Sequence, residues 1–185
     1  AAGTPVLLSR TSSGEVQAFF NMCSHRGAQI MPEGVGNTHR FTCPYHAWTY
    51  NLQGDLTVIY ANKDFGDLDK TCHSLTPLPC LERAGLIWVT LNQNSTLPIE
   101  TFLSGYDALL AHFNFEGWHH FASQTVEGPN WKIAYDGYMD LYHLPILHKD
   151  TFGPDYPNRA NYYNWGPHQR VAGPDPRLAE YQDHA

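Results

Sequence analysis

Two short segments of the chain each combine one cysteine with one histidine. One residue separates Cys23 from His25, 17 residues lie between His25 and Cys43, and two residues separate Cys43 from His46. The pattern is therefore C-x-H followed by C-x2-H. Thiolate sulfur and imidazole nitrogen both bind transition metals, the first as a soft anion and the second as a neutral ligand. The four side chains together could hold a metal centre with mixed ligands.

A Rieske [2Fe–2S] cluster requires this ligand set, because two cysteines hold one iron and two histidines hold the other. Neutral histidine in place of anionic thiolate also raises the reduction potential of such a cluster. Zinc is the alternative, since two cysteines and two histidines bind it tetrahedrally. Structural zinc sites more often pair like residues at C-x2-4-C and H-x3-5-H spacing. Each segment here mixes the two residue types, which favours the iron–sulfur cluster.

The residues around these ligands resemble the Rieske family in both segments. The first reads Cys-Ser-His-Arg-Gly at 23–27 and the second Cys-Pro-Tyr-His-Ala at 43–47. The family usually has glycine where Ala47 stands. Respiratory members carry an extra cysteine in each segment, and the two form a disulfide; Ala28 and Tyr45 occupy those places here. The resemblance therefore implies the low-potential cluster of oxygenases and their ferredoxins.

A second candidate metal site consists of Asp140, His143 and His148. Two histidines and one carboxylate with open positions form the facial triad of non-haem Fe(II) oxygenases. Asp140 and His143 are three residues apart, so on a helix they would share a face. Pro145 should end or kink that helix and so turn His148 back toward His143. The chain contains 11 histidines, so this pair taken alone is typical of ordinary structural histidines.

The segment around this second site resembles the catalytic-domain signature of Rieske non-haem iron oxygenases, large (α) subunit. It reads N-W-K-x3-D-x3-D-x-Y-H-x4-H from Asn130 to His148. The order of the two sites along the chain also matches that family. The one departure is Asp136-Gly137, where the family more often has glutamate followed by asparagine or another residue.

This resemblance implies that His143 and His148 bind a mononuclear Fe(II). The third ligand would be an aspartate downstream of residue 185, and neither Asp150 nor Asp155 is expected in its place. Family members assemble as homotrimers or as α3β3. In such a ring, Asp140 would bridge His46 of one subunit and His143 of the next and carry electrons between them.

The function implied by the resemblance is that of a terminal oxygenase component. A separate reductase, with or without a ferredoxin, would pass electrons from NAD(P)H to the cluster, and the Fe(II) would activate O2. Cis-dihydroxylation of an aromatic substrate is the expected reaction, with monooxygenation or demethylation as the alternative within the family. In a different class, a Rieske ferredoxin would explain the first 95 residues but leave the amphipathic helix that follows them and the segment from Asp140 to His148 without a role.

Composition limits the remaining possibilities. The chain has 185 residues, a net charge of −7 and no basic block, so nucleic acid is not an expected partner. No apolar run approaches the roughly 18 residues of a membrane span, and no signal peptide opens the chain. We therefore expect a bacterial cytoplasmic protein in which Cys72 and Cys80 are reduced thiols. The start at Ala1 and the lack of a closing element before Ala185 predict a piece of a longer protein.

The predicted fold class is α+β. Residues 1–115 are expected to form a small antiparallel β Rieske domain with a trailing amphipathic helix, because short strand candidates alternate with glycine turns, as at Tyr50–Leu56. Residues 116–185 are expected to begin a catalytic domain of helix and antiparallel sheet. A strand is predicted at 121–126, a helix from Asn130, and loop over the last thirty residues. The apolar residues of the trailing helix follow helical spacing without interruption: Ile99, Phe102, Leu103, Tyr106, Leu109, Leu110 and Phe113.

Overall fold

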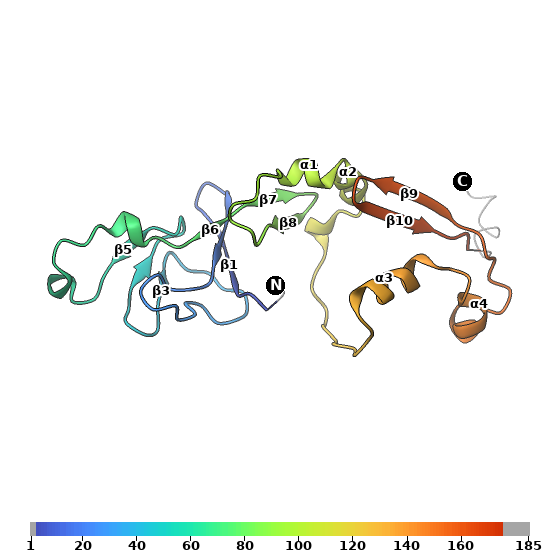
Figure 1. Cartoon of the computed structure of the whole chain (residues 1–185), viewed down its shortest axis with the longest axis horizontal. Helices are drawn as coiled ribbons and strands as arrows, with labels where there is room; N and C mark the ends of the chain where they lie inside the picture. The colour runs from blue at the N-terminus through green and yellow to red at the C-terminus, as the bar shows by residue number, and fades with distance from the viewer. Residues whose placement is uncertain (1–2, 176–185) are drawn as a thin grey trace. The chain divides into compact units, whose positions relative to one another are not determined.

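The computed structural model describes residues 3–175, which divide into two compact units (Figure 1). The first unit runs to Thr101 and includes Leu110–Glu116. The second comprises Phe102–Leu109 and the chain from Gly117 onward. Short helices and antiparallel sheets occur together, so the α+β fold class is confirmed. None of the helices in the described part has the length and hydropathy that crossing a membrane requires.

The first unit is built from short strands. They form the antiparallel sheets β1–β2–β6, β3–β4–β5 and β7–β8. Their bounds are β1 Val6–Arg10, β2 Val16–Phe20, β3 Phe41–Thr42, β4 Thr49–Tyr50, β5 Leu56–Val58, β6 Pro77–Leu78, β7 Cys80–Arg83 and β8 Leu86–Val89. Two 3-10 helices, η1 Asn62–Phe65 and η2 Lys70–His73, lie between β5 and β6. The short antiparallel strands predicted for this part of the chain are therefore present.

The predicted turn between β4 and β5 brings the chain against the core. Asn51 closes it, because its backbone N–H donates to the Asp55 carbonyl at 3.0 Å and its side-chain oxygen accepts the Asp55 N–H at 2.8 Å. Gly54 has φ of 84°, and a Cβ there would overlap the Phe19 ring. Phe19 and Tyr50 are among the most buried side chains of the unit. The core also contains Leu7, Cys23, Ile30, Phe41, Cys43, Trp48, Leu56, Ile59 and Leu75.

The two cysteine-containing loops have the same backbone hydrogen bonds. The Cys23 N–H donates to the Ala28 carbonyl, and the Cys43 N–H donates to the Trp48 carbonyl, both at 2.8 Å. In return the Gly27 N–H donates to Cys23 and the Ala47 N–H to Cys43, at 2.8 and 3.0 Å. Both donors at the fourth position after cysteine are left-handed, with φ of 72° for Gly27 and 56° for Ala47. Each loop therefore closes on its buried cysteine, and the three side chains that follow it are less buried than the cysteine itself.

The amphipathic helix predicted over residues 99–113 is not continuous, so the prediction of a single helix is wrong. It forms two short helices, α1 Ile99–Leu103 and α2 Tyr106–Ala111, followed by the 3-10 helix η3 Phe115–Gly117. Ser104 and Gly105 separate them with φ of 53° and 85°. A left-handed pair cannot continue a right-handed helix, and glycine adopts this conformation without steric cost. The apolar spacing survives the break, which is why the sequence pattern concealed it.

From Gly117 onward, the second unit contains a segment without regular structure and then the predicted helix. α3, Trp131–Met139, starts at Asn130, whose side-chain oxygen caps the Lys132 N–H at 3.0 Å. The strand predicted at 121–126 is wrong. Those residues have no regular structure, and Phe121 and Val126 are exposed. A strand needs a neighbouring strand for its backbone groups, and the described residues offer none to this segment.

The loop expected near the end of the chain is also partly wrong. After α4 Leu144–Leu147 and α5 Lys149–Phe152, an antiparallel hairpin forms from β9 Asn161–Trp165 and β10 His168–Ala172. Gly166, with φ of 55°, lies in its turn. Tyrosine and tryptophan favour strands, and they outweigh the asparagines of β9. The rest of the expected loop, residues 176–185, lies outside the described residues.

The left-handed conformation of Ala47 yields a prediction about stability. Replacing Ala47 with glycine should stabilise the chain by about 0.5–1 kcal/mol, because an alanine Cβ is strained at this φ and glycine is not. The reciprocal change, Gly27→Ala, should cost a similar amount, since a Cβ there meets only Met22 at ordinary contact distance. The midpoint of urea unfolding measures both. Equal unfolding midpoints for the wild-type chain, Ala47→Gly and Gly27→Ala would show that the left-handed conformation does not strain either loop.

Candidate metal centres

The two candidate cysteine ligands lie inside the first unit. Cys23 and Cys43 are both buried, with 3% and 2% of their surface exposed, and both are free thiols. Cys23 Sγ lies 3.2 Å from the Tyr50 hydroxyl. Burial raises the pKa of the Cys23 thiol, while the hydrogen bond with Tyr50 lowers it and the neighbouring Cys43 thiol raises it further. A buried thiol is inert toward solvent and needs a cation to hold it as a thiolate.

The two candidate histidine ligands lie on the loop tips and touch each other. The ring centroids of His25 and His46 are 4.7 Å apart at an interplanar angle of 66°. Trp48 stacks on His25 at the same centroid distance, with the planes 9° from parallel. Burial lowers the pKa of His25, and electrostatic interaction with the neighbouring His46 and Arg26 side chains lowers it further. His25 is therefore held in the neutral form, which is the form that binds metals.

Two buried polar atoms at this place have no partner in the protein. Among the described residues, the buried side-chain nitrogens without a hydrogen bond are His25 Nδ1 and Trp48 Nε1. Native proteins rarely leave such atoms unsatisfied without a functional reason. A ligand nitrogen of this kind fits a histidine that binds iron, so the residues present fit a Rieske cluster.

The grouping of the ligands bears on the zinc alternative. A tetrahedral zinc site requires all four ligands around one point. A [2Fe–2S] cluster requires two pairs, thiolates on one iron and imidazoles on the other. Buried thiols and mutually contacting imidazoles suit the two-iron arrangement better.

The second candidate site lies between α3 and α5. The prediction that Asp140 and His143 share a helix face is wrong, because α3 ends at Met139 and Asp140 follows it in an extended conformation, φ −100° and ψ 116°. The two side chains are nevertheless close, with Asp140 Oδ2 3.5 Å from His143 Nδ1. The other carboxylate oxygen accepts the Tyr142 N–H at 2.8 Å. This local hydrogen bond, and not a helix, aims the carboxylate at His143.

Pro145 has the predicted effect on the chain. It lies in the first turn of α4, which starts after His143 and ends before His148. This single turn brings the two imidazoles together, with ring centroids 5.3 Å apart at 67°. His143 is partly exposed, at 30% of its side chain, and Asp140 is exposed at 55%. Both side chains are therefore accessible from outside this unit.

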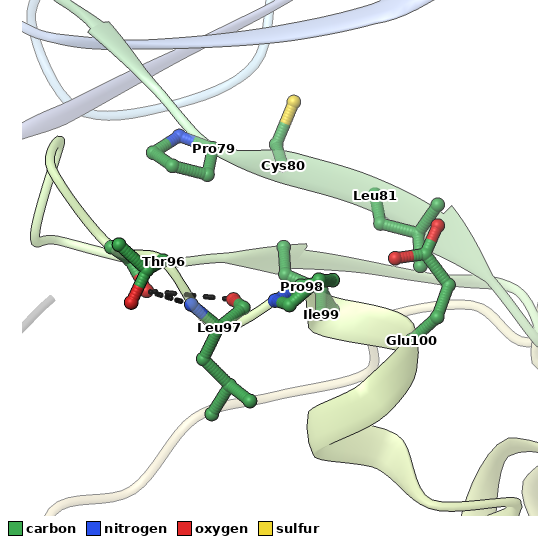
Figure 2. Close-up of a pocket in the computed structure, with 9 residues that line it drawn as sticks. Pro79, Cys80, Leu81, Thr96, Leu97, Pro98, Ile99 and Glu100 are labelled. Carbon is green, nitrogen blue, oxygen red and sulfur yellow. Dashed lines mark hydrogen bonds between the residues drawn. The ribbon is translucent and has the colours of Figure 1, made fainter.

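The first unit also contains two further cysteines and a cavity. The other cysteines, exposed Cys72 and half-buried Cys80, are free thiols, as expected. A cavity of about 270 Å3 lies between β7 and the segment leading into α1 (Figure 2). Its lining includes none of the candidate ligands, and the Cys80 sulfur points away from Thr96 and Leu97 in this view. The cavity is separate from the metal chemistry.

Sequence reasoning missed the residues that support the ligands. The sequence pattern assigned no role to Ser24, Trp48 or Tyr50. Their roles depend on contacts with residues far away in the sequence, for which spacing carries no signal. Aromatic residues directly after the second cysteine loop were the one available hint.

Comparison with known proteins identifies two domain families along the chain. Residues 1–79 match the Rieske [2Fe–2S] domain, and residues 115–185 match the catalytic domain of the ring hydroxylating alpha subunit. The glycine betaine monooxygenase oxygenase subunit of Chromohalobacter salexigens is 32% identical over 148 residues, 79% of this chain and 33% of that protein. The anthranilate 1,2-dioxygenase large subunit of Acinetobacter baylyi is 31% identical over 152 residues, 78% of this chain and 32% of that protein.

A solved structure is similar over most of the described chain. It is that of a quaternary ammonium Rieske monooxygenase, reported to give insights into carnitine oxidation by gut microbiota and inter-subunit electron transfer. The TM-score is 0.74 at 28% identity, over 88% of this chain and 45% of that one. The chain thus spans between 32% and 45% of the length of these proteins. It belongs to the Rieske non-haem iron oxygenases, large (α) subunit, of which it carries the Rieske domain and part of the catalytic domain.

Proposed function

We propose that this chain is part of the terminal component of an O2-dependent oxygenase. The observation that carries the proposal is the presence, in one chain, of two kinds of metal-ligand set. The first unit holds the paired cysteine and histidine loops, and the second holds His143 beside His148 and the Asp140 carboxylate. A Rieske ferredoxin would need only the first set. The boundary between the two functional parts is proposed near residue 115.

Each ligand has a defined task in this proposal. Cys23 and Cys43 hold one iron of the cluster, and His25 and His46 hold the other. When bound, the Rieske cluster supplies one-electron transfer and the mononuclear Fe(II) supplies O2 activation. Burial of the two thiols keeps water from the sulfur atoms, and the stacked Trp48 ring fixes the plane of His25.

The second set is incomplete by itself. His143 and His148 supply two ligands, and the third, an aspartate, comes from a part of the protein beyond residue 185. Asp140 orients the His143 imidazole through its Nδ1 side, because the carboxylate is held by the Tyr142 N–H. Such outer partners fix the tautomer and direction of a ligating histidine.

The proposed partners follow from the need for electrons. A reductase, with or without a ferredoxin, transfers them from NAD(P)H to the cluster in the bacterial cytoplasm. The subunits are proposed to assemble as a homotrimer or as α3β3, in which Asp140 links His143 to His46 of a neighbouring subunit. The exposure of Asp140 leaves it available for such a contact. The solved structure of the similar monooxygenase is reported to give insights into inter-subunit electron transfer, which supports this arrangement.

Two reactions are candidates for the complete protein. Cis-dihydroxylation of an aromatic ring is the reaction expected from the sequence, and the similarity to an anthranilate dioxygenase supports it. Monooxygenation of a quaternary ammonium compound is favoured by the similarity to the glycine betaine and quaternary ammonium enzymes. Product mass after reaction with labelled O2 separates them, since the first adds two oxygen atoms from O2 to the substrate and the second adds one.

The cluster proposal predicts the metal content of the 185-residue chain. Anaerobic reconstitution with iron and sulfide should give two irons and two acid-labile sulfides per chain, with the visible spectrum and reduced-state EPR signal of a Rieske centre. The potential should fall within the Rieske range of about −150 to +300 mV, toward its lower end.

His46→Cys is the matched variant, because it supplies a third thiolate in place of an imidazole. More negative charge on the cluster should shift the potential of this variant downward. Tight binding of one zinc per chain, without sulfide and without the EPR signal, would contradict the assignment of the four ligands.

The role of Asp140 predicts a defect in electron transfer without loss of metal. In the full-length protein, Asp140→Asn should retain three irons per subunit, yet slow the oxidation of the pre-reduced protein by O2 and substrate about 10- to 100-fold. The amide keeps the shape of the side chain but loses the charge that holds the His143 imidazole. Single-turnover absorbance measurements give the rate.

The control for this experiment is His143→Ala, which removes a ligand and should lower the iron content to two. A near wild-type rate for Asp140→Asn, with three irons present, would show that the carboxylate has no part in the transfer.

A further inference from the structure

The Tyr50 hydroxyl is the centre of a small hydrogen-bond network beside Cys23. It lies 3.2 Å from Cys23 Sγ, 2.9 Å from Ser24 Oγ and 3.2 Å from the Ser24 backbone nitrogen. Ser24 Oγ also lies 2.5 Å from the carbonyl oxygen of His73, at the end of η2. Tyr50 is fully buried, whereas Ser24 is at the surface of the unit.

The number of protons in this network limits how it can be arranged. A carbonyl oxygen only accepts, so the short contact with His73 uses the hydroxyl proton of Ser24. The Ser24 backbone N–H donates to the Tyr50 oxygen. One proton is left for the remaining two contacts, that of the tyrosine hydroxyl. Two acceptors face it, Ser24 Oγ and Cys23 Sγ.

We propose that Ser24 is a positioning residue that sets the reduction potential at Cys23, by competing with the cysteine sulfur for the single hydroxyl proton of Tyr50. This inference rests on the proposed function, in which Cys23 is a cluster ligand. The His73 carbonyl keeps the Ser24 lone pairs directed at Tyr50, because it holds the serine proton on the opposite side. Ser24 thus acts on the sulfur through the tyrosine and not by direct contact.

The sign of the effect follows from charge. A hydrogen bond to a ligating thiolate withdraws electron density, which stabilises the more negative, reduced state and raises the potential. Removing the serine oxygen leaves the sulfur as the acceptor that faces the tyrosine proton, so the potential rises. Removing the tyrosine hydroxyl takes the proton away altogether, so the potential falls.

The test uses the reconstituted 185-residue chain and an EPR-monitored redox titration. At a fixed applied potential, Ser24→Ala should raise the ratio of reduced to oxidised cluster about threefold, and Tyr50→Phe should lower it about tenfold. At about 59 mV per tenfold change for one electron, these are shifts of about +28 and −59 mV. In the Tyr50→Phe background, Ser24→Ala should have no further effect, because its action requires the hydroxyl proton.

Three matched variants separate this role from a merely structural one. Ser24→Thr keeps the hydroxyl and should retain the wild-type potential, whereas Ser24→Val has the same shape without it and should behave like Ser24→Ala. Ser9→Ala removes the same kind of bond elsewhere in the unit, from a hydroxyl to the Leu52 carbonyl at 2.6 Å, and should leave the potential unchanged. If Ser24→Ala fails to take up a cluster, the difference in potential between Ser24→Thr and Ser24→Val provides the same test.

The outcomes are distinguishable from those that test the proposed function. Suppose that the wild-type chain gives a Rieske spectrum, and that the potential of Ser24→Ala and Ser24→Val is unchanged or lowered. This result overturns the present inference and leaves the proposed function intact. So does a Ser24→Ala shift that persists in the Tyr50→Phe background. Absence of a Rieske spectrum from the wild-type chain overturns the proposed function and this inference together.

Discussion

The closure of each cysteine loop by backbone hydrogen bonds is the constraint on which the first unit depends. The cysteine N–H reaches the carbonyl five residues ahead, and the cysteine carbonyl receives the N–H four residues ahead. This places both sulfurs in the core and both imidazoles at the tips. It also requires a left-handed residue at the end of each turn, which glycine supplies at position 27 and alanine, under strain, at position 47.

Because the two thiols are buried, the hydrogen bond that the Tyr50 hydroxyl makes with the Cys23 sulfur has a strong influence on that sulfur. A sulfur in an apolar core is costly to ionise, as the raised pKa of Cys23 reflects, so a hydrogen-bond donor beside it has a large effect. Tyr50 is that donor, and burial with its hydrogen bond to Cys23 keeps its own pKa far above that of free tyrosine. The phenol therefore keeps its proton at any physiological pH and can only donate or share it. On the histidine side, Trp48 stacks on His25, and the buried Nδ1 of His25, which lacks a hydrogen-bond partner among the described residues, is the atom that would bind an iron.

The ligands were predictable from sequence because metal chemistry dictates residue type and spacing within a few positions. The proximity of Asp140 to His143 was also predictable, but its cause was not. The sequence suggests a shared helix face, whereas an extended residue and the Tyr142 N–H provide the contact. Ser24, Tyr50 and His73 could not be predicted as a group, since 26 and 49 residues separate the bonded partners. Helical apolar spacing across residues 99–113 likewise carries no information on the sign of φ at Ser104 and Gly105.

The central claim is that two imidazoles and two thiolates of this chain share one two-iron cluster. Pulsed EPR of the reduced chain, reconstituted from protein in which only histidine carries 15N, tests it most directly. Two strongly coupled 15N nuclei are expected, and one should disappear in each of His25→Cys and His46→Cys. A reduced cluster without strongly coupled histidine nitrogen, or with couplings that survive both substitutions, would contradict the account.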